Sequence, residues 1–545
     1  MKAASWRFVC DLDEVLPEAG VAALIDGRQI AVFRINDQVY ALDNYDPNSG
    51  ANVLARGLVG DLQGEPVVAS PLYKHHFNLA TGRCMEDATR SVRVYPARVS
   101  EGRIWVRSEP MRKIAQTRRL VVVGNGMAGM KAVEQLLELA PDAYEITVFG
   151  AEPHPNYNRI LLSPVLAGEK RVDEIILNPI EWYREKGVRL HTGDPIVEID
   201  RRRRLARSKA GVEVAYDRLL LATGSNPFVL PVPGADLPGV VTFRDLEDVD
   251  AMLTASRTHR KAVVIGGGLL GLEAANGLLK RGMAVTVVHI FETLMERQLE
   301  RAAATLLKES LEKRGLKFRM AAKTAAILAN SGQRMTDGEE TAPFATLPPA
   351  PSLQPPAARR VSAVQFDDGS ELEADLVVMA AGIRPNIDLA LTAGLRCERG
   401  VLVSDTMQTF DPGIYAVGEC VQHRNSTYGL VAPLYEQANV CATHLAEFGI
   451  GRYKGSLVAA QLKVSGIDLF SAGDFVGGPR SEPLVLRDAK RGVYKRVVIE
   501  DNRVRGAVLY GDVKDGPWYV ELMTEGRDVG ALRDKLLFGA AFAAP

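Results

Sequence analysis

The feature that most constrains this chain is a strand–glycine–helix pattern that occurs twice. The apolar run R-R-L-V-V-V leads into G-x-G-x-x-G at Gly124, Gly126 and Gly129, and a helix with one apolar face follows. The second copy follows K-A-V-V-I and has its glycines at Gly266, Gly268 and Gly271. Each copy predicts the start of a parallel α/β sheet whose first helix begins at a phosphate-binding turn.

The first glycine motif has the context that a dinucleotide site requires. Gly124 allows the tight turn, Gly126 lets a pyrophosphate approach the backbone, and Gly129 lets the helix close on the strand. The helix N-terminus favours the phosphate charge. An acid closes the next strand, where a ribose hydroxyl needs an acceptor. The predicted contacts of this motif are Gly124, Gly126, Met127, Ala128, Gly129 and Glu152.

The second motif leaves the cofactor preference open. Its second strand, A-V-T-V-V-H, ends in His289, where a carboxylate favours NADH and an arginine favours NADPH. Histidine permits either, and the lack of a basic pair directly after it favours NADH slightly. The predicted contacts here are Gly266, Gly268, Leu269, Leu270, Gly271 and His289.

Two dinucleotide folds in one chain predict two dinucleotides, FAD in one and NADH or NADPH in the other. The cofactors supply the redox chemistry, and the protein positions them. The formal net charge of −1, from 66 Lys+Arg and 67 Asp+Glu, gives no reason to expect a nucleic acid or an anionic membrane as partner. No apolar run is long enough to span a membrane and no signal peptide opens the chain, so we expect a cytoplasmic protein.

The chain divides by its patterns into an all-β N-terminal domain, the two α/β domains and an α+β C-terminal domain. Q-I-A-V-F-R-I and Q-V-Y-A-L-D predict a hairpin in the first. R-R-R-R at 201–204 predicts a solvated hairpin turn, and a last helix is expected near Val529–Phe538. The predicted boundaries are 1–110, linker 111–117, FAD-binding 118–240 and 388–450, NAD(P)H-binding 241–387 with a proline-rich insertion 330–360, and 452–545.

The five cysteines do not predict a redox centre. They stand at positions 10, 84, 397, 420 and 441, and none forms C-x-x-C. An iron–sulfur cluster normally needs four ligands, and dithiol flavoenzymes need a close reactive pair. We therefore expect free thiols that pack as small hydrophobes.

Further motifs resemble the two-dinucleotide-fold flavoprotein reductases. These are L-L-L-A-T-G-S-N-P at 219–227, V-V-M-A-A-G-I-R-P-N at 377–386, I-Y-A-V-G-E-C at 414–420, H-P-N-Y-N-R-I-L-L-S-P-V-L-A-G at 154–168 and L-Y-E-Q-A-N-V-C-A at 434–442. The resemblance implies FAD contacts at Arg159, Ala222, Thr223, Gly224, Gly418, Glu419, Glu436 and Gln437, and nicotinamide contacts at Glu273 and Gly382. Glu273 fits equally well as a helix-N-terminal acid stabilised by the dipole. Glu273 and Glu436 are the candidate catalytic groups near the nicotinamide and flavin.

Two segments resemble the large subunit of assimilatory NAD(P)H nitrite reductase in particular. They are H-I-F-E-T-L-M-E-R-Q-L-E at 289–300 and Y-K-G-S-L-V-A-A-Q-L-K-V-S-G-I-D-L-F-S-A-G-D-F at 453–475. The likeness covers about 118–540 and then stops. It implies the electron-input half of that enzyme without its [2Fe–2S] and sirohaem modules.

The N-terminal domain resembles the small subunit of the same reductases, a Rieske-like fold without its cluster ligands. The patterns G-A-N-V-L-x-R-G-L-V-G-D and A-S-P-L-Y-K-x-H-F carry this likeness. A Rieske centre uses C-x-H and C-x-x-H. Those four positions are taken by Asp46, Asn48, Ser70 and Tyr73, while His75 and His76 are out of register. We therefore expect no metal and no iron–sulfur cluster in this chain, and a structural or docking role for the domain.

The favoured function is an NAD(P)H-oxidising, FAD-containing electron-transfer subunit for nitrogen-oxyanion assimilation. Its expected partner is a molybdenum nitrate reductase subunit with iron–sulfur clusters, and a sirohaem nitrite reductase is the second choice. The alternative is a self-contained NAD(P)H oxidase or a ferredoxin or rubredoxin reductase. A flavin-bound assembly protein without activity is a third reading, disfavoured by the intact nicotinamide and flavin motifs.

Overall fold

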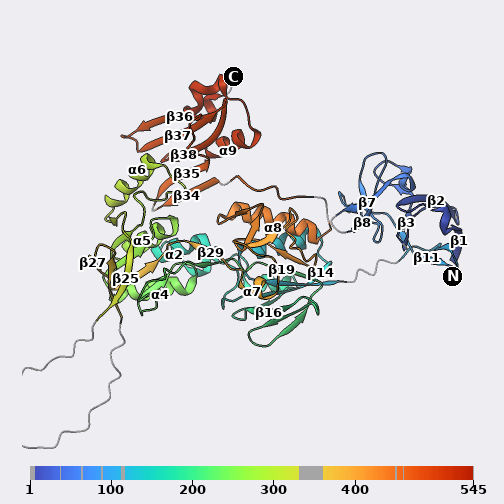
Figure 1. The fold of residues 1–545 in the computed structure, drawn as a ribbon, viewed down its shortest axis with the longest axis horizontal. Helices are drawn as coiled ribbons and strands as arrows, with labels where there is room; N and C mark the ends of the chain where they lie inside the picture. Colours follow the sequence, from blue (N-terminus) through green and yellow to red (C-terminus); the bar gives the residue numbers. More distant parts are fainter. Residues whose placement is uncertain are drawn as a thin grey trace, which may run out of the picture. The chain divides into compact units, whose positions relative to one another are not determined.

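A computed structural model describes most of the chain, and Figure 1 shows its fold as a ribbon. The described residues are 6–36, 38–62, 65–87, 90–111, 117–330, 360–447, 451–457, 459–464 and 466–543. Nearly all of the predicted proline-rich insertion and of the predicted linker lies outside them. The chain forms two compact units, Met1–Asn156 with Asn178–Gly224 and Asn386–Gly455, and Tyr157–Leu177 with Ser225–Pro385 and Ser456–Pro545.

The N-terminal part of the first unit is made of short antiparallel strands. Its sheets run β1-β12-β11, β10-β4-β3-β2 and β7-β8-β9, with the pair β5-β6. The predicted hairpin is confirmed, because β3 pairs with β4 through Ile35↔Gln38. The strands are β1 Trp6–Asp11, β2 Ala19–Ile25, β3 Arg28–Ile35, β4 Gln38–Asp43, β5 Tyr45–Asp46, β6 Ala51–Asn52, β7 Leu58–Leu62, β8 Glu65–Ala69, β9 His76–Asn78, β10 Val94–Tyr95, β11 Ala97–Ser100 and β12 Arg103–Arg107.

The first glycine motif opens a five-stranded parallel sheet in the order β15-β14-β13-β19-β31. Its central strand β13 buries every residue from Leu120 to Val123, because a parallel strand in an α/β domain is covered on both faces. The strands are β13 Arg118–Val123, β14 Tyr144–Phe149, β15 Arg189–His191, β19 Arg218–Leu221 and β31 Ile414–Ala416.

One face of this sheet is covered by α1 (Met127–Leu139) and α8 (Val431–Leu445). Val133 and Leu136 are buried between them, as the helical period predicts. A three-stranded antiparallel sheet, β16 (Ile196–Asp200), β17 (Leu205–Ser208) and β18 (Glu213–Ala215), carries the four-arginine turn between its first two strands, which confirms that hairpin.

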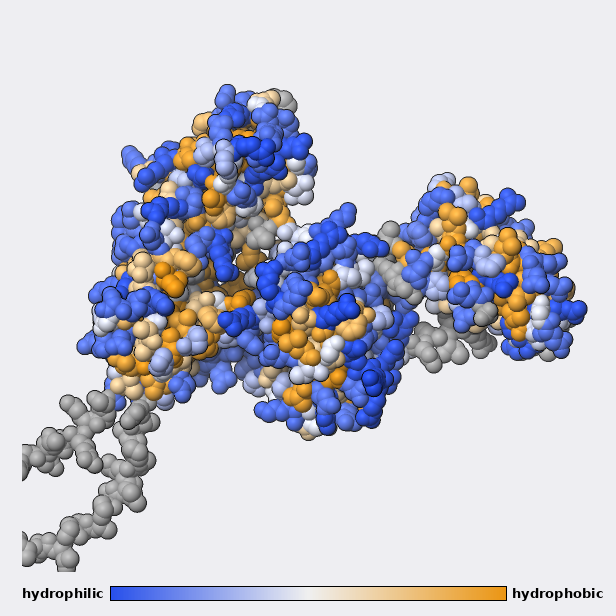
Figure 2. Space-filling model, in the orientation of Figure 1, coloured by the Kyte–Doolittle hydropathy of each residue, from blue (hydrophilic) through white to orange (hydrophobic). Residues whose placement is uncertain are grey.

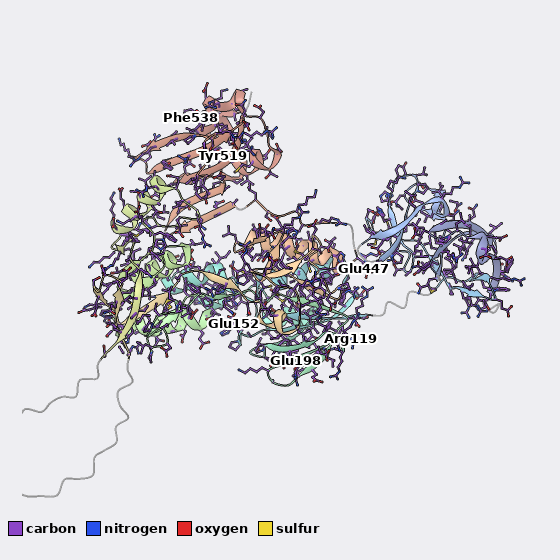
Figure 3. All side chains as sticks on the ribbon, viewed as in Figure 1. Arg119, Glu152, Glu198, Glu447, Tyr519 and Phe538 are labelled. Atoms are coloured by element: carbon purple, nitrogen blue, oxygen red, sulfur yellow. The ribbon has the colours of Figure 1, made fainter. Side chains whose placement is uncertain are left out.

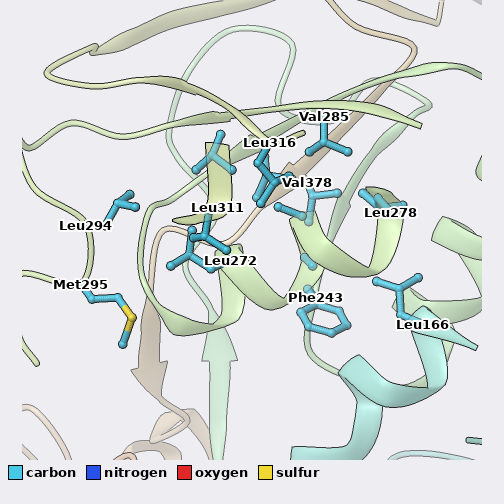
Figure 4. Packing of buried hydrophobic residues seen from close by; sticks show 14 of the residues in the cluster. Leu166, Phe243, Leu272, Leu278, Val285, Leu294, Met295, Leu311, Leu316 and Val378 are labelled. Carbon is cyan, nitrogen blue, oxygen red and sulfur yellow. The ribbon is translucent and has the colours of Figure 1, made fainter. Parts of the chain in front are cut away.

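The second glycine motif opens another five-stranded parallel sheet, in the order β21-β28-β22-β23-β24. Leu272 and Leu278 of the helix that follows pack into a large apolar cluster with Val285 and Val378 of the sheet (Figure 4). The strands and helices of this layer are β21 Val240–Thr242, α4 Leu246–Thr258, β22 Lys261–Ile265, α5 Leu269–Lys280, β23 Ala284–Val288, α6 Arg301–Glu312, β24 Lys317–Arg319 and β28 Leu376–Met379. A separate antiparallel sheet consists of β25 Thr324–Ala329, β26 Val361–Phe366 and β27 Glu371–Glu373.

The C-terminal part of the second unit is a five-stranded antiparallel sheet in the order β34-β35-β38-β37-β36. One face buries Tyr519 of the helix α9, and the other contributes Tyr510, whose hydroxyl lies 2.6 Å from that of Ser310 on α6. The predicted last helix is present as the 3-10 helix η6. The elements are β34 Ala459–Val464, β35 Ile467–Gly473, β36 Glu482–Asp488, β37 Val493–Glu500, β38 Arg503–Tyr510, α9 Gly516–Glu525, η6 Gly530–Phe538 and α10 Ala540–Ala543.

Short elements connect these layers. They are η1 Leu12–Glu14, η2 Leu54–Arg56, η4 Arg159–Leu161, α2 Leu162–Ala167, η5 Val172–Ile175, α3 Ile180–Glu185, β20 Ser225–Pro227, β29 Ile383–Pro385, α7 Asp388–Thr392, β30 Val401–Val403, β32 Val421–His423 and β33 Ser426–Thr427. On the face shown in Figure 2, hydrophilic residues dominate and apolar residues occur in small groups among them. None of the described helices is both long and apolar enough to cross a lipid bilayer.

The C-terminal sheet holds a buried cation at Lys495 on β37. Its ammonium lies 3.0 Å from a carboxylate oxygen of Asp512 and 3.1 Å from one of Asp515. The Lys495 side chain is only 5% exposed and that of Asp515 only 8% exposed. Two carboxylates therefore compensate one buried ammonium, and removal of the cation leaves Asp515 buried without its countercharge.

We expect Lys495→Ala to lower the free energy of unfolding of this domain by about 3–5 kcal/mol, because the uncompensated carboxylate stays buried. Lys514→Ala is the matched control, since Lys514 is 73% exposed and lies 3.8 Å from Asp512. The control should change stability by less than about 0.5 kcal/mol. Hydrogen exchange of β37 and β38 amides measures both changes, and equal effects of the two variants would contradict the prediction.

Candidate dinucleotide-binding sites

The first glycine turn brings its backbone against the neighbouring strand. Gly124 has a φ of +115°, and a Cβ added there would lie 2.1 Å from the carbonyl oxygen of Ala222. Only glycine fits this position. At Gly129 an added Cβ would lie 2.8 Å from the Cβ of Ala222, so α1 packs directly on the strand end. These contacts place the start of α1 at the carboxyl edge of the sheet.

The same turn presents open backbone where a phosphate is expected. Gly126 is the N-cap of α1, and a Cβ added to it would meet no atom within 4 Å. Met127 and Ala128 form the first turn of the helix, whose unpaired N–H groups and dipole favour an anion. The predicted residues of the glycine loop therefore form a cradle with the shape and polarity that a pyrophosphate requires.

Asn125, which the sequence analysis did not single out, fixes the shape of this turn. Its Oδ1 accepts a hydrogen bond of 2.7 Å from the Tyr183 hydroxyl, and its Nδ2 donates to the His154 carbonyl oxygen at 3.3 Å. Burial raises the pKa of Tyr183 to about 12, so its hydroxyl remains a donor. The sequence indicated this role of Asn125 only by placing an amide side chain between Gly124 and Gly126.

Gln437 on α8 holds the turn at Gly418 by a hydrogen bond. The Gly418 N–H donates to Oε1 of Gln437 on α8 at 3.0 Å, and Gln437 is fully buried. Its Nε2 has no hydrogen-bond partner within the described structure. A buried donor without a partner is costly, and a bound ligand would satisfy it. The neighbouring predicted residues Glu419 and Glu436 are partly buried and exposed, respectively.

The A-T-G turn after β19 is held by backbone contacts. The Thr223 hydroxyl donates to the Asn386 carbonyl oxygen at 2.7 Å. The Asn386 N–H donates to the Gly224 carbonyl oxygen at 2.9 Å. Ala222 forms the floor beneath the first glycine turn. The structure therefore brings the predicted residues Ala222, Thr223 and Gly224 together with the glycine loop at one edge of the sheet.

Two of the charged residues of the predicted FAD site, Glu152 and Arg159, lie in different units. Glu152 follows β14 in the first unit and is partly buried (Figure 3). Arg159 belongs to the second unit, where its guanidinium donates to the Arg244 carbonyl oxygen at 3.0 Å and lies over the Tyr157 ring. The contact of Arg159 with the FAD phosphates stays a prediction.

The second glycine turn repeats the geometry of the first. Gly266 has a φ of +131°, and a Cβ there would lie 2.2 Å from the carbonyl oxygen of Ala380. Gly268 is the N-cap of α5 and faces open space, as Gly126 does. Leu269 and Leu270 begin α5, and Gly271 packs on the backbone of the turn. Gly382 lies exposed after β28.

His289 at the end of β23 is turned toward the protein. Its Nδ1 accepts a hydrogen bond of 3.0 Å from the Gly267 N–H, which leaves Nε2 as the ring nitrogen that can donate. Nε2 lies 3.0 Å from Oε2 of Glu296. The side chain is only 7% exposed. His289 therefore supports the glycine turn, and its contact with a cofactor stays a prediction.

Glu273, the fifth residue of α5, is a partly buried carboxyl that accepts a hydrogen bond from a hydroxyl group. Ser163 Oγ donates to its Oε2 at 2.8 Å. Burial raises the pKa of Glu273 to about 7, and the hydrogen bond from Ser163 only partly offsets this. The carboxyl can therefore take up or release a proton near neutral pH. Its place on the helix after the glycine turn agrees with the predicted nicotinamide site.

Three of the four positions predicted for a Rieske ligand set, Asp46, Asn48 and Ser70, are joined by hydrogen bonds. Ser70 Oγ donates to Oδ2 of Asp46 at 2.6 Å, and both residues are fully buried. Burial by itself raises the pKa of Asp46, yet hydrogen bonds from Ser70 and the neighbouring backbone lower it overall. Asn48 accepts a hydrogen bond from Arg90 at 3.0 Å, while Tyr73 is 64% exposed.

Of the two nearby histidines, His76 is bonded to a carboxylate. His76 Nδ1 lies 2.6 Å from Oε1 of Glu86, and its neighbour His75 is partly buried. Within the described ranges, no group of three or more His, Cys, Asp or Glu side chains is arranged to hold a metal ion. The cysteines in those ranges are free thiols, as predicted.

Three protein-family models match consecutive parts of the chain. The pyridine nucleotide-disulphide oxidoreductase model matches residues 118–444. A Rieske-like [2Fe-2S] domain model matches 5–107, and the rubredoxin NAD+ reductase C-terminal domain model matches 459–527. The two dinucleotide folds and their cradles define a nicotinamide-dependent flavoprotein reductase. The chain belongs to the pyridine nucleotide-disulphide oxidoreductase family, and FAD with NADH or NADPH is the cofactor pair that this family and the two cradles support.

Two of the similar curated proteins are named for nitrite or nitrate reduction. The chain is 46% identical over 412 residues to nitrite reductase [NAD(P)H] of Bacillus subtilis, covering 76% of this chain and 48% of that protein. It is 42% identical over 419 residues to the assimilatory nitrate reductase electron transfer subunit of the same organism, covering 77% and 51%. The chain spans about half the length of these relatives.

Solved structures show the same fold at lower identity. NADH:rubredoxin oxidoreductase from Clostridium acetobutylicum is 24% identical and superposes with a TM-score of 0.60, covering 76% of this chain and 97% of that one. The predicted two-dinucleotide-domain architecture, preceded by a Rieske-like domain and followed by a small C-terminal domain, is therefore confirmed.

The raised pKa of Glu273 predicts a pH-dependent loss of stability. The unfolded chain releases this proton near pH 4.5, whereas the folded chain keeps it to about pH 7. Stability therefore falls as the pH rises between these values, by about 1–3 kcal/mol. Glu273→Gln should remove this loss, whereas Ser163→Ala should extend it to higher pH because the carboxylate loses a donor.

Thermal unfolding of the FAD-loaded chain at pH 5 and pH 8, without nicotinamide, measures this effect. Glu247→Gln is the control, because Glu247 is an exposed carboxyl on α4. If the wild type and Glu273→Gln showed the same change between the two pH values, Glu273 would not titrate in this range.

Proposed function

We propose that this chain oxidises NADH or NADPH through FAD and passes the electrons to iron–sulfur centres on a partner subunit of an assimilatory nitrate or nitrite reductase. The observation that carries the proposal is the pair of glycine cradles, one in each unit, with no metal-binding group among the described residues. The names of the two Bacillus subtilis relatives support the choice of acceptor.

The chain's own groups would hold the two cofactors in the following way. In the first unit, Gly126 and the N-terminus of α1 receive the FAD pyrophosphate, and Glu152 accepts from its ribose. Gln437 Nε2 supplies a buried donor to the same cofactor. In the second unit, Gly268 and the start of α5 receive the nicotinamide dinucleotide. FAD supplies the hydride-accepting, one-electron-donating chemistry when it is bound.

Glu273 holds or releases a proton beside the nicotinamide site in this proposal. Its carboxyl has a pKa of about 7, and Ser163 fixes its orientation. The remaining predicted contacts, including Arg159, Glu419, Glu436 and Gly382, belong to the same proposal, and so does a place for His289 at the edge of the second dinucleotide site. So do the four-domain division of the chain and a cytoplasmic location, which the free thiols support.

A molybdenum nitrate reductase with its own iron–sulfur clusters is the proposed partner, and a sirohaem nitrite reductase is the second choice. The match of 459–527 to a rubredoxin reductase C-terminal domain favours one alternative, a reductase that serves a small iron–sulfur protein. These functions differ in the protein that accepts the electrons, because oxidation of NADH or NADPH through FAD is the same in each.

We further propose that the Rieske-like domain binds no iron–sulfur cluster and acts as a structural or docking element. Iron requires thiolate and imidazole ligands in a Rieske centre. The side chains at the corresponding positions here are the carboxylate of Asp46, the amide of Asn48, the hydroxyl of Ser70 and the exposed phenol of Tyr73. The 2.6 Å contact between Asp46 and Ser70 fills the space where a metal would separate them.

The electron-transfer proposal predicts a strict dependence on the acceptor. Anaerobic stopped-flow spectroscopy should show rapid bleaching of the flavin by NADH or NADPH. Steady-state nitrate reduction should appear only when a molybdenum nitrate reductase subunit is added, and nitrite reduction is tested with a sirohaem enzyme. Rapid turnover with oxygen alone, or with rubredoxin in preference to both reductases, would overturn the proposed function.

The cluster-free proposal predicts iron below about 0.1 per chain and no Rieske-type EPR signal after reduction. Ser70→Ala should destabilise the N-terminal domain by about 1.5–3 kcal/mol, since the buried Asp46 carboxylate loses a donor. Tyr73→Phe at the fourth ligand position is the control and should have little effect, because the side chain is exposed. Stoichiometric iron in the purified chain would overturn the proposal.

A further inference from the structure

The segment after β23, residues 289–297, carries the side chains that could bind the ribose of a dinucleotide in the second site. In a fold of this kind the adenine ribose lies between the glycine turn and the end of the second strand. His289 stands at that strand end, and Gly267 is in the glycine turn. A side chain that recognises the 2′-position must therefore reach the space beside these two residues.

His289 itself is not available for that role. Both ring nitrogens face protein groups, Nδ1 the Gly267 N–H and Nε2 the Glu296 carboxylate. A Cβ added to Gly267 would lie 2.7 Å from Cγ of His289, so the ring packs against the glycine turn. The proton on Nε2 makes His289 a donor to Glu296, and the carboxylate becomes the outermost group of the pair.

Glu296 is held in place by the turn that carries it. The Met295 N–H donates to the Gly267 carbonyl oxygen at 3.0 Å. Leu294 and Met295 are buried in the same apolar cluster as Leu272 (Figure 4). Gly267 is thus bonded to the segment twice, through His289 and through Met295. Glu296 follows directly and is 32% exposed, so its carboxylate is fixed by His289 and still open on one side.

The cations near this position are engaged elsewhere or exposed. Arg301 pairs with Glu292, and both side chains are more than 70% exposed. Arg319 at the end of β24 bonds to Asp368 and lies over the Phe366 ring. Arg297, next to Glu296, is exposed. A carboxylate oriented by a histidine is therefore the group built into this edge of the glycine turn.

We propose that Glu296, positioned by His289, accepts the hydrogen bond of the adenine-ribose 2′-hydroxyl and makes the chain prefer NADH to NADPH. The inference rests on the proposed function, because it requires a nicotinamide dinucleotide in the second cradle. A carboxylate forms a strong charge-assisted hydrogen bond with a hydroxyl. The same charge repels a 2′-phosphate a few ångströms away. Glu296 takes the place of the acid that usually ends the strand, and His289 is a positioning residue.

The test compares flavin reduction by NADH and by NADPH in the FAD-loaded full chain. Glu296→Gln keeps the shape and removes the charge, and should lower the ratio of kcat/KM for NADH over NADPH by about 10- to 100-fold. The change should appear in KM, with the rate of flavin reduction at saturating NADH within about twofold of wild type, because the site lies at the adenosine end.

Glu292→Gln is the matched control. It removes one negative charge four positions earlier, from a side chain that is 71% exposed and paired with Arg301. This variant should leave the ratio within about twofold. His289→Asn should lower the ratio less than Glu296→Gln, because it keeps an acceptor for Gly267 and loses the donor to Glu296. Arg297→Gln should leave the NADPH rate unchanged.

The outcomes separate this inference from the proposed function. If neither nucleotide reduces the flavin of the wild type, the proposed function fails first. If NADH reduces it and Glu296→Gln shifts the ratio no more than Glu292→Gln does, only the role of Glu296 is overturned. A wild type that prefers NADPH and loses that preference on Arg297→Gln would assign the 2′-position to Arg297 and overturn the inference.

Discussion

The close approach of two glycine turns to their neighbouring strands is the constraint on which the rest of this structure depends. At Gly124 and Gly266 a single added carbon would overlap a carbonyl oxygen of the adjacent loop, at 2.1 and 2.2 Å. This contact fixes where α1 and α5 begin, so their unpaired N–H groups lie at the carboxyl edges of the two sheets. Gly126 and Gly268 then face open space. Each unit can therefore receive a phosphate at the start of its helix.

Several buried polar groups of this chain have protein partners, whereas two polar groups beside the glycine turns are only partly satisfied. Asp46, Lys495 and His289 each have their donors or acceptors supplied by the fold. Gln437 Nε2 is buried without a partner, and the Glu273 carboxyl has a hydroxyl for a partner and a pKa raised to about 7. Buried polar groups left in this state cost stability unless a ligand compensates them. Their location beside the two cradles is therefore physical support for ligand sites there.

In the proposed cluster-free form of the N-terminal domain, a hydrogen bond takes the place of a metal. A cluster cross-links two loops in a Rieske fold, and here the hydrogen bond between Ser70 and Asp46 joins the same two loops. A charge-assisted hydrogen bond between fully buried groups gives the loops a defined geometry. In the proposed electron-transfer function, the domain therefore contributes a rigid surface, and the redox path is left to the dinucleotide cofactors and the partner.

The sequence by itself determined the two glycine motifs, the order of the domains and the residue types at the positions predicted for Rieske ligands, because each rests on residue type and spacing along the chain. The tertiary structure alone placed Asn125 against Tyr183, Ser163 against Glu273 and Glu296 against His289. These contacts join residues from different turns or elements, and periodicity carries no information on which side chains meet. His289 shows the difference most clearly. Its position at a strand end predicted a cofactor contact, whereas its burial and two hydrogen bonds direct it inward to the glycine turn.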